Sequence, residues 1–289
     1  MSHPDASRFQ LGAMTLPYLR WSFDRALEGI ARAGFRHVGL RPGHADGPLL
    51  PDEPTAADYR AVRRRIEGHG LTPALMFARR DPGDPVENLR RDVDAIAELG
   101  VPHLLVIPVS PSPKFAKQRL GEMAWFAQVE EWFRIMGPAA RRAERRGVTI
   151  VLKPHGGIAG TGEDLALIVE RLGSPAVRVC YDPGNVVYYE GVRPEPDLPQ
   201  VADLVRAVCI KDHRGGQAVE DFPTPGDGDI DHVAIFRALR DAGFAGPCLI
   251  ERIDGLETPE EVDRELARGR EYLERSVAEV DQTDGGDGR

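Results

Sequence analysis

The sequence predicts an α/β protein that folds as a single closed (β/α)₈ TIM barrel, and three observations support this fold class. Short apolar runs alternate with amphipathic segments along the chain, which is typical of a parallel sheet covered by helices. Eight such pairs occur within 289 residues, which suits a closed barrel better than an open doubly wound sheet. The first apolar run is not followed by a G-x-G-x-x-G motif, which disfavours a dinucleotide-binding fold.

The predicted strands are short and mostly apolar, and most of them end at a charged or polar side chain. In chain order they cover residues 12–16, 37–41, 72–77, 103–109, 149–153, 178–182, 207–211 and 248–252. A helix that spans a bilayer needs about 20 apolar residues. Because the longest apolar run is far shorter, we expect no association with a membrane.

The predicted helices lie between these strands, and each carries its apolar residues on one face. They cover residues 23–33, 56–68, 86–99, 123–146, 163–171, 197–205, 232–242 and 259–279. Several are followed by glycine, the residue that most often ends a helix. We expect one domain over residues 1–280, a loop over 111–118, and a flexible C-terminal tail over 281–289, which is rich in Gly and Asp.

Composition and charge exclude several classes of protein. The net charge of −9 lacks the basic field that neutralises phosphates, so we expect no nucleic-acid partner. Three cysteines are too few for a disulfide framework and suit a reducing compartment. The first ten residues show no basic segment followed by an apolar one, as a secretory signal would. We therefore expect a cytoplasmic protein whose partner is a small molecule.

Polar side chains stand at the end of the second predicted strand and of each of the last four, or within a few residues after it. They are Arg41 at the second strand, Lys153 and His155 at the fifth, Asp182 and Asn185 at the sixth, Lys211, His213 and Arg214 at the seventh, and Glu251 at the eighth. Only four of the 37 basic residues are lysine, and two of these four stand here. Because active sites of such barrels lie at the C-terminal ends of the strands, we predict one site at this end.

Alternation along the strands places the cysteines relative to this site. Side chains two positions apart point to the same face of a strand. Cys180 therefore lies one layer below Asp182, and Cys209 one layer below Lys211, inside the barrel. Cys248 falls on the other face of its strand, where we expect a small core residue.

The second half of the chain resembles the xylose isomerase-like TIM-barrel superfamily of sugar and sugar-phosphate isomerases and epimerases. The segments that carry the resemblance are V-L-K-P-H at 151–155, D-P-G-N at 182–185, K-D at 211–212, P-G-D-G-D-I-D at 225–231 and I-E at 250–251. The first half agrees through G-F-R-H-V-G-L at 34–40. The resemblance thus spans most of the chain, although no motif identifies one substrate.

The resemblance implies a divalent metal ion, often Mn²⁺, Mg²⁺ or Co²⁺, held by Glu, Asp, His and Glu on strands five to eight. In such relatives the metal polarises the substrate oxygens, and flanking carboxylates move a proton between carbons. Asp182 and Glu251 match this pattern. Lys153 and Cys209 stand where the first Glu and the His are expected. The usual metal site therefore cannot be assumed for this chain.

Three hypotheses for the site are left open. In the first, Asp182, Glu251 and His155 bind the metal, with His213 as a further candidate, and such a donor set suits Mn²⁺, Fe²⁺ or Zn²⁺. In the second, the Lys153 ammonium occupies the place of the metal between the two carboxylates, and His155 transfers the proton. In the third, Lys153 or Lys211 forms a Schiff base with a carbonyl substrate. The simplest alternative is a structural network of ion pairs without catalytic use.

We expect an isomerase or epimerase that acts on a small polyhydroxy carbonyl compound through an enediolate. The expected catalytic residues are Lys153, His155, Lys211 and Glu251, and the expected substrate-binding residues are Arg41, Asn185, His213 and Arg214. The alternatives are a lyase or aldolase with a related substrate, and a carbohydrate-binding homologue without activity. Barrels of this type often dimerise, which leaves a homodimer open.

Overall fold

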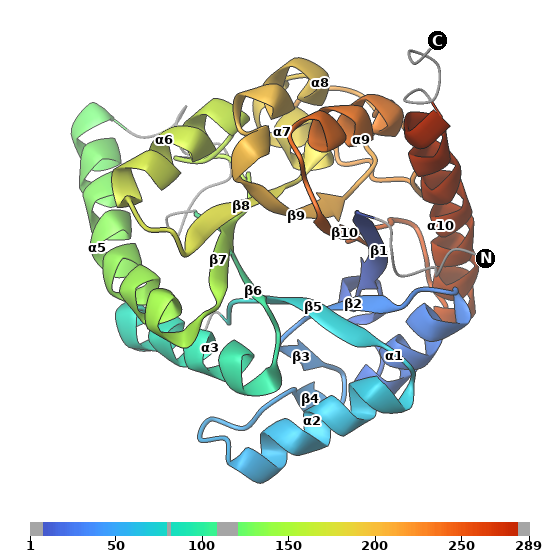
Figure 1. The fold of residues 1–289 in the computed structure, drawn as a ribbon, viewed down its shortest axis with the longest axis horizontal. Coiled ribbons are helices and arrows are strands. Elements are labelled where there is room, and N and C mark those ends of the chain that lie inside the picture. The colour runs from blue at the N-terminus through green and yellow to red at the C-terminus, as the bar shows by residue number, and fades with distance from the viewer. Residues whose placement is uncertain (1–7, 80–81, 109–120, 283–289) are drawn as a thin grey trace.

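The computed structural model describes residues 8–79, 82–108 and 121–282. Its parallel strands close into a barrel in the order β1-β10-β9-β8-β7-β6-β5-β2, and helices surround this barrel (Figure 1). The strands are β1 (Phe9–Met14), β2 (His37–Leu40), β5 (Thr72–Phe77), β6 (His103–Val106), β7 (Thr149–Leu152), β8 (Val177–Tyr181), β9 (Val205–Ile210) and β10 (Gly246–Ile250). The predicted (β/α)₈ barrel is confirmed.

The surrounding helices begin and end within a few residues of the predicted positions. They are α1 (Phe23–Arg32), α2 (Ala56–Gly68), α3 (Pro85–Leu99), α5 (Glu122–Arg146), α6 (Gly162–Leu172), α9 (His232–Asp241) and α10 (Pro259–Gln282). Thr55 and Thr161 begin α2 and α6 with capping boxes, which satisfy backbone N–H groups of the first turn. Gly100 and Gly147 end α3 and α5 in the left-handed conformation, with φ of 71° and 66°.

The segment between β8 and β9 differs from the prediction. The predicted helix over residues 197–205 is wrong, because the chain there forms two 3₁₀ turns, Leu198–Gln200 and Ala202–Leu204. Two short helices precede these turns, α7 (Pro183–Glu190) and α8 (Pro194–Asp197). Proline at the start of each short helix lacks a backbone N–H and cannot continue a preceding helix, so the segment is divided into short pieces.

Two further segments differ from the prediction. A small hairpin, β3 (Gly43–His44) paired with β4 (Gly47–Pro48), follows β2 and was not predicted. The last helix, α10, extends to Gln282, so the first two residues assigned to the tail are helical. Residues 283–289 and the predicted loop over 111–118 lie outside the described residues.

Apolar side chains fill the barrel in two separate layers. The inner layer lies inside the strands and comprises Met14, Leu75, Phe77, Leu105, Val151, Cys180, Ala207, Cys209 and Leu249. The outer layer packs the strands against the helices and includes Cys248. The sides predicted for the three cysteines are therefore confirmed. This alternation also turns the residue after each strand toward the barrel axis or away from it.

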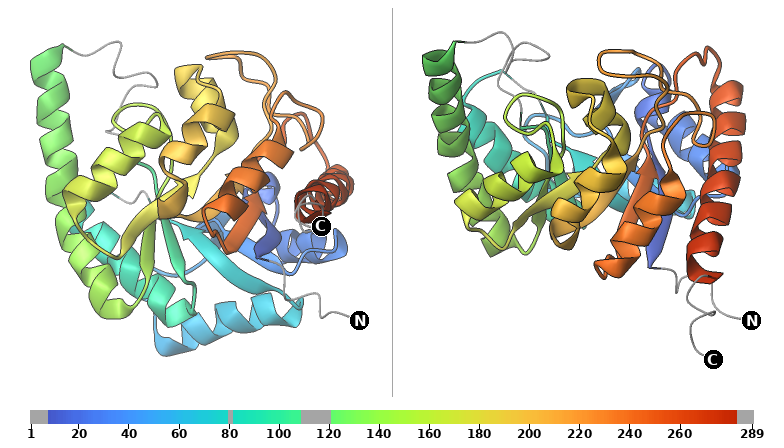
Figure 2. Two further views of the ribbon diagram at one scale, coloured as in Figure 1. Left: turned by 45° about the horizontal axis from the view of Figure 1, so that its top comes forward. Right: turned by 90° about the horizontal axis from the view of Figure 1, so that it is seen from above.

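One end of the barrel carries the loops that follow the strands. Figure 2 shows these loops crowded at one end, whereas α10 runs down the side toward the opposite end. Four neighbouring strands, β7 to β10, end side by side at the loop end. The polar residues that follow them are thereby brought to one place.

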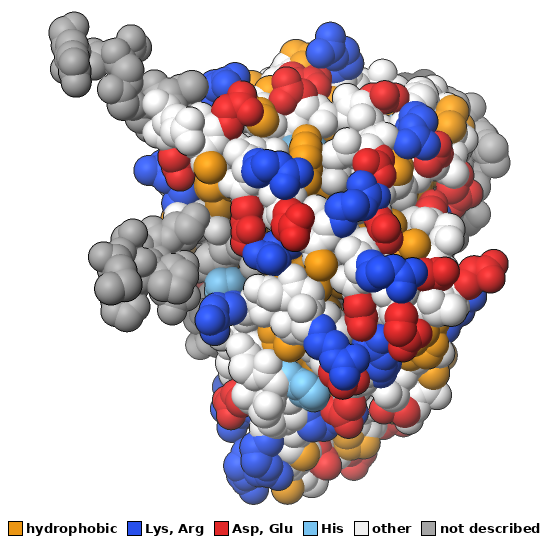
Figure 3. Space-filling model, turned by 90° about the vertical axis from the view of Figure 1, so that its right-hand side faces the viewer, with side chains coloured by type: hydrophobic (Ala, Val, Ile, Leu, Met, Phe, Trp, Pro, Cys, Tyr) orange, Lys and Arg blue, Asp and Glu red, His pale blue; other side chains and the backbone are white. Residues whose placement is uncertain are grey.

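Basic and acidic side chains are interleaved on the face shown in Figure 3. Ion pairs join Arg25 to Asp263 at 2.8 Å and Arg268 to Asp227 at 2.6 Å. Charges of opposite sign thus lie close together where α10 meets its neighbours. Among the described residues, no helix combines the length and the apolar character that crossing a membrane requires.

Candidate active site

A polar cavity of about 260 Å³ opens at the C-terminal ends of the strands. It is lined by Leu16, Arg41, Phe77, Ile107, His155, Asn185, Tyr188, Tyr189, Lys211, Phe222, Glu251 and Arg252. A larger hollow of about 370 Å³ lies between β1 and α10 at the other end, away from the charged strand ends. The cavity at the C-terminal ends of the strands is therefore the candidate active site.

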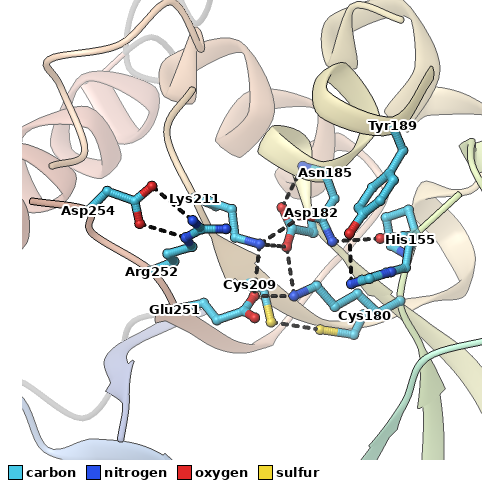
Figure 4. A network of polar contacts seen from close by, with 12 residues as sticks. His155, Cys180, Asp182, Asn185, Tyr189, Cys209, Lys211, Glu251, Arg252 and Asp254 are labelled. Carbon is cyan, nitrogen blue, oxygen red and sulfur yellow. Dashed lines mark hydrogen bonds and ion pairs between the residues drawn. The ribbon is translucent and has the colours of Figure 1, made fainter. Parts of the chain in front are cut away.

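Two lysines and two carboxylates form a buried cluster at the floor of this cavity. Lys153, Asp182, Lys211 and Glu251 are each the first residue after their strand, and none is more than 5% exposed. Lys153 Nζ lies 2.9 Å from Asp182 Oδ2 and donates a hydrogen bond to Glu251 Oε2. Lys211 Nζ lies 3.2 Å from Asp182 Oδ2 and 3.6 Å from Glu251 Oε2. Figure 4 shows Lys211 beside Asp182 and Glu251, with their contacts as dashed lines.

Asp182 and Asn185 hold this cluster in place from the start of α7. The backbone N–H of Asn185 donates to Asp182 Oδ1 at 2.9 Å, so one carboxylate oxygen caps the helix while the other faces the lysines. The Asn185 amide donates to the carbonyl oxygen of Pro154 at 2.7 Å. Its oxygen accepts from Lys211 Nζ at 2.8 Å. Asn185 thereby joins the ends of three neighbouring strands (Figure 4).

Opposite charges keep Lys153 and Glu251 ionised although both are buried. Burial opposes the charged form of Lys153, but Asp182 and Glu251 outweigh it and raise the pKa of the ammonium well above its usual range. Burial also opposes the charged form of Glu251, but Lys153 and Lys211 hold the pKa of this carboxyl far below its ordinary value. A protonated amine cannot attack a carbonyl carbon, so this environment disfavours a Schiff base at Lys153.

Three side chains at the cluster carry atoms that can bind metal ions. The ligand atoms of Asp182, Cys209 and Glu251 lie within 4.8 Å of one another, and by spacing alone they could hold an ion. The Lys153 ammonium, however, contacts both carboxylates, has no lone pair to donate and repels a cation. Burial raises the pKa of the Cys209 thiol, and a metal requires the thiolate. These residues therefore do not fit a divalent metal site.

His155 belongs to a second group, which faces the cluster across the cavity. Its Nε2 lies 3.0 Å from the hydroxyl of Tyr189, and the two rings lie 4.4 Å apart between centroids (Figure 4). Burial raises the pKa of Tyr189 above its usual range, so the phenol keeps its proton. Tyr189, which the sequence analysis gave no role, lies on α7, a helix that the sequence did not predict. The two residues form a hydrogen-bonded pair at the cavity wall.

The predicted substrate-binding residues lie in different places. Arg41 lines the cavity, with its guanidinium 4.8 Å from the centre of the Phe77 ring. His213 is buried beside the cavity, where its Nε2 lies 2.7 Å from the carbonyl oxygen of Val219. Arg214 points away and is ion-paired with Asp221 at 3.0 Å. His213 and Arg214 belong to the long loop after β9, and neither lines the cavity.

Arg252 lines the cavity although no role was predicted for it. Its guanidinium is held by Asp254 at 2.6 Å and by Glu220 at 3.1 Å. It also lies 4.3 Å from the centre of the Phe222 ring, another lining residue that was not predicted. The position of Arg252 directly after Glu251 was the only signal in the sequence for its presence at this end.

Comparisons with known proteins place the chain in a family. A family model described as "Xylose isomerase-like TIM barrel" matches residues 27–275. The inosose dehydratase of Geobacillus kaustophilus (strain HTA426) is 29% identical over 254 residues, which cover 79% of each chain. The ketose 3-epimerase of Arthrobacter globiformis is 26% identical over 220 residues, which cover 71% of each chain.

Solved structures share the fold at lower sequence identity. The 3-keto-D-glucoside 4-epimerase of E. coli has a TM-score of 0.73 at 19% identity, covering 91% of this chain and 99% of that one. A D-tagatose 3-epimerase-like protein has a TM-score of 0.74 at 17% identity, covering 95% and 99%. The predicted resemblance is therefore confirmed, and the chain belongs to the xylose isomerase-like TIM-barrel family.

Proposed function

We propose that the protein is an enzyme that moves a proton next to the carbonyl group of a small polyhydroxy compound, as an isomerase or epimerase. The observation that carries this proposal is the buried cluster of Lys153, Asp182, Lys211 and Glu251 at the floor of a polar cavity. Charged groups that are buried in opposed pairs beside a cavity are typical of catalytic sites. The ketose 3-epimerase among the relatives supports the same class of reaction.

The cavity suits a substrate of this kind. Its volume of about 260 Å³ is below the range of pockets for drug-sized ligands, which is about 300–1,000 Å³. Donors and acceptors on several sides, among them Arg41, Asn185 and Lys211, match a compound with many hydroxyl groups. Tyr188 and Phe222 supply flat apolar walls.

Lys211 and His155 have the chemistry that enolisation requires. The imidazole of His155 accepts the proton from the carbon beside the carbonyl, and Tyr189 holds the ring in place. The Lys211 ammonium donates a hydrogen bond to the carbonyl oxygen, which becomes negatively charged as the enediolate forms. Epimerisation follows when water protonates the same carbon from its opposite face and His155 passes the first proton to solvent. Protonation of the neighbouring carbon gives an isomer. Glu251 and Asp182 orient the two ammonium groups.

The test is proton exchange in D₂O with a panel of ketoses and inososes, followed by ¹H NMR. We expect loss of the signal of the carbon-bound proton beside the carbonyl and the appearance of a new stereoisomer. His155→Asn and Lys211→Met should each slow this exchange by at least about 100-fold, the lower range for general acid–base groups. Absence of exchange with every compound of the panel would contradict the proposal.

A second candidate is dehydration, which the inosose dehydratases among the relatives favour. An enediolate that carries a hydroxyl group on the next carbon can expel it. The proton taken from carbon then returns to the leaving oxygen, and one molecule of water is released. The same NMR experiment separates the two reactions, because dehydration removes one carbon-bound oxygen whereas epimerisation conserves them all.

A further inference from the structure

We propose that the Lys153 ammonium takes the place of a divalent metal ion, so that this site is built to work without one. The inference concerns the site of the proposed function and rests on that function for its catalytic consequence. Its evidence is the position of Lys153 between two carboxylates that a metal would otherwise join.

The cluster is already electrically neutral. Asp182 and Glu251 contribute two negative charges, and Lys153 and Lys211 contribute two positive charges. Lys153 Nζ lies 2.9 Å from Asp182 Oδ2, and Lys211 Nζ lies 3.2 Å from the same oxygen and 3.6 Å from Glu251 Oε2. A divalent ion would add two positive charges to a group that is almost fully buried. Uncompensated charge in such a place carries a large desolvation penalty. The charge count thus opposes metal binding here.

Lys153 also carries the same net charge as the glutamate and divalent ion that the resemblance implies at this position. At the fifth strand, a glutamate and a divalent ion together would carry one positive charge, which is also the charge of one ammonium. Lys153 reaches both remaining carboxylates directly, as the ion would have to do. Cys209 stands where the resemblance implies a histidine, and one neutral side chain replaces another.

The thiol of Cys209 lies near the two carboxylates and also contacts a second cysteine. Its sulfur lies 3.5 Å from the sulfur of Cys180, within the apolar inner layer of the barrel. A thiol of this kind packs as a small apolar side chain. The cluster is neutral, Lys153 contacts both carboxylates, and Cys209 supplies a thiol in place of an imidazole. These three observations all disfavour a bound metal ion. Lys211, which lines the cavity, then delivers the charge that reaches the substrate oxygen.

Metal content and thermal stability of the wild-type protein test the inference without reference to activity. The protein is purified, treated with or without EDTA, and its metal content is measured by mass spectrometry. Melting curves are then recorded with EDTA and with added Mn²⁺, Mg²⁺, Co²⁺ or Zn²⁺. We expect no stoichiometric metal and the same Tm throughout. A stoichiometric ion whose removal lowers the Tm would overturn the inference, because a ligand bound to the native state stabilises it.

The variant Lys153→Glu tests whether a metal ion binds once the ammonium is replaced by a carboxylate. It changes the net charge of the cluster from 0 to −2 and adds a third carboxylate, so a divalent ion would restore neutrality. We expect this variant to bind Mn²⁺ or Co²⁺ in stoichiometric amount and to melt at a higher temperature when either ion is added. The matched control is Lys153→Met, which removes the ammonium without adding a ligand and should bind either ion much more weakly.

The possible results lead to separate conclusions. If Lys153→Glu folds and gains no affinity for metal over Lys153→Met, the inference is overturned. If Lys153→Glu does not fold, the wild-type metal content and Tm still decide. If no sugar reacts but the wild type is free of metal and Lys153→Glu binds it, the proposed function fails while the inference stands.

Discussion

The hydroxyl group of Tyr189 is one of the points at which α7 contacts the loop after β7. It lies 3.0 Å from His155 Nε2, and both residues line the cavity opposite Lys211 and Glu251. An imidazole on a loop turns freely unless a partner fixes it. Tyr189 is therefore a positioning residue for His155, and its loss should change the rate of proton transfer more than substrate binding.

The variant Tyr189→Phe keeps the ring and removes the hydroxyl group. We expect kcat to fall about 10-fold, which corresponds to one neutral hydrogen bond of about 1.4 kcal/mol, with little change in KM. The measurement is steady-state kinetics on the substrate identified by proton exchange, with the pH profile of kcat. In a cycle with His155→Asn, the double variant should be no slower than His155→Asn alone. Fully additive losses would mean that Tyr189 acts independently of His155.

The loop between β9 and α9 shows how one buried side chain fixes a whole element. Asp212 is fully buried and accepts four backbone N–H bonds, from His213, Gly226, Gly228 and Ile230, at 2.8–3.2 Å. A Cβ atom on Gly228 would lie 2.2 Å from Asp212 Oδ1, so glycine is required there. Because this loop carries Phe222 into the cavity wall, Asp212 supports the site from a distance.

The variant Asp212→Asn should destabilise the protein and impair the site together. The amide nitrogen replaces one acceptor oxygen, so at least one backbone N–H loses its partner at a cost of about 1–3 kcal/mol. We expect a lower Tm by differential scanning calorimetry and a higher KM. The control is Asp229→Asn, because Asp229 is exposed and its bond to the N–H of Gly215 is at the surface. Equal Tm values for wild type and Asp212→Asn would contradict this role.

The elements that the sequence predicted well are those with a long regular pattern. The helices α2 and α6 begin after a Thr that is followed three residues later by Asp. The strands are short apolar runs, and the polar residues that end these runs placed Lys153 and Glu251 at one end of the barrel. The short helix α7 has no such pattern, since D-P-G-N is equally typical of a turn. Tyr189 could not be assigned without α7.

The remaining discrepancies concern loops. The residue that directly follows a strand keeps the direction that the strand gives it, so Lys211 was placed at the barrel mouth. His213 and Arg214 lie two and three residues further, where contacts with Val219 and Asp221 decide the course of the chain. Such contacts are tertiary and leave no periodic signal in the sequence.

Folding lowers the pKa of three histidines, His44, His103 and His232. Burial, assisted by the nearby charge of Arg206, lowers the pKa of His103 to about 4. Burial is also the main cause that lowers the pKa of His44 and of His232. In the unfolded chain a histidine has a pKa of about 6.5. As the pH falls below that value, the unfolded state therefore takes up protons that the folded state does not, and stability decreases.

We expect the free energy of unfolding in urea to be lower at pH 5.5 than at pH 7.5. One fully shifted histidine contributes a loss of about 1.4 kcal/mol for each pH unit below its unfolded pKa. This window lies above the ordinary pKa values of carboxyl groups, so histidines dominate the change. The variant His103→Gln should lose less stability over the same interval. A free energy of unfolding that is constant or rises toward pH 5.5 would contradict the expectation.

The closure of the barrel has a consequence for the order in which a growing chain becomes functional. β1 pairs with β10 from Phe9 opposite Gly246 to Ala13 opposite Ile250, so the first strand to be made waits for the last. Glu251 follows immediately and completes the ion pairs of Lys153. During synthesis, a chain that stops short of β10 leaves both β1 and β9 with an open edge and a lysine without one carboxylate. The final strand thus closes the barrel and completes the ion-paired cluster in a single event.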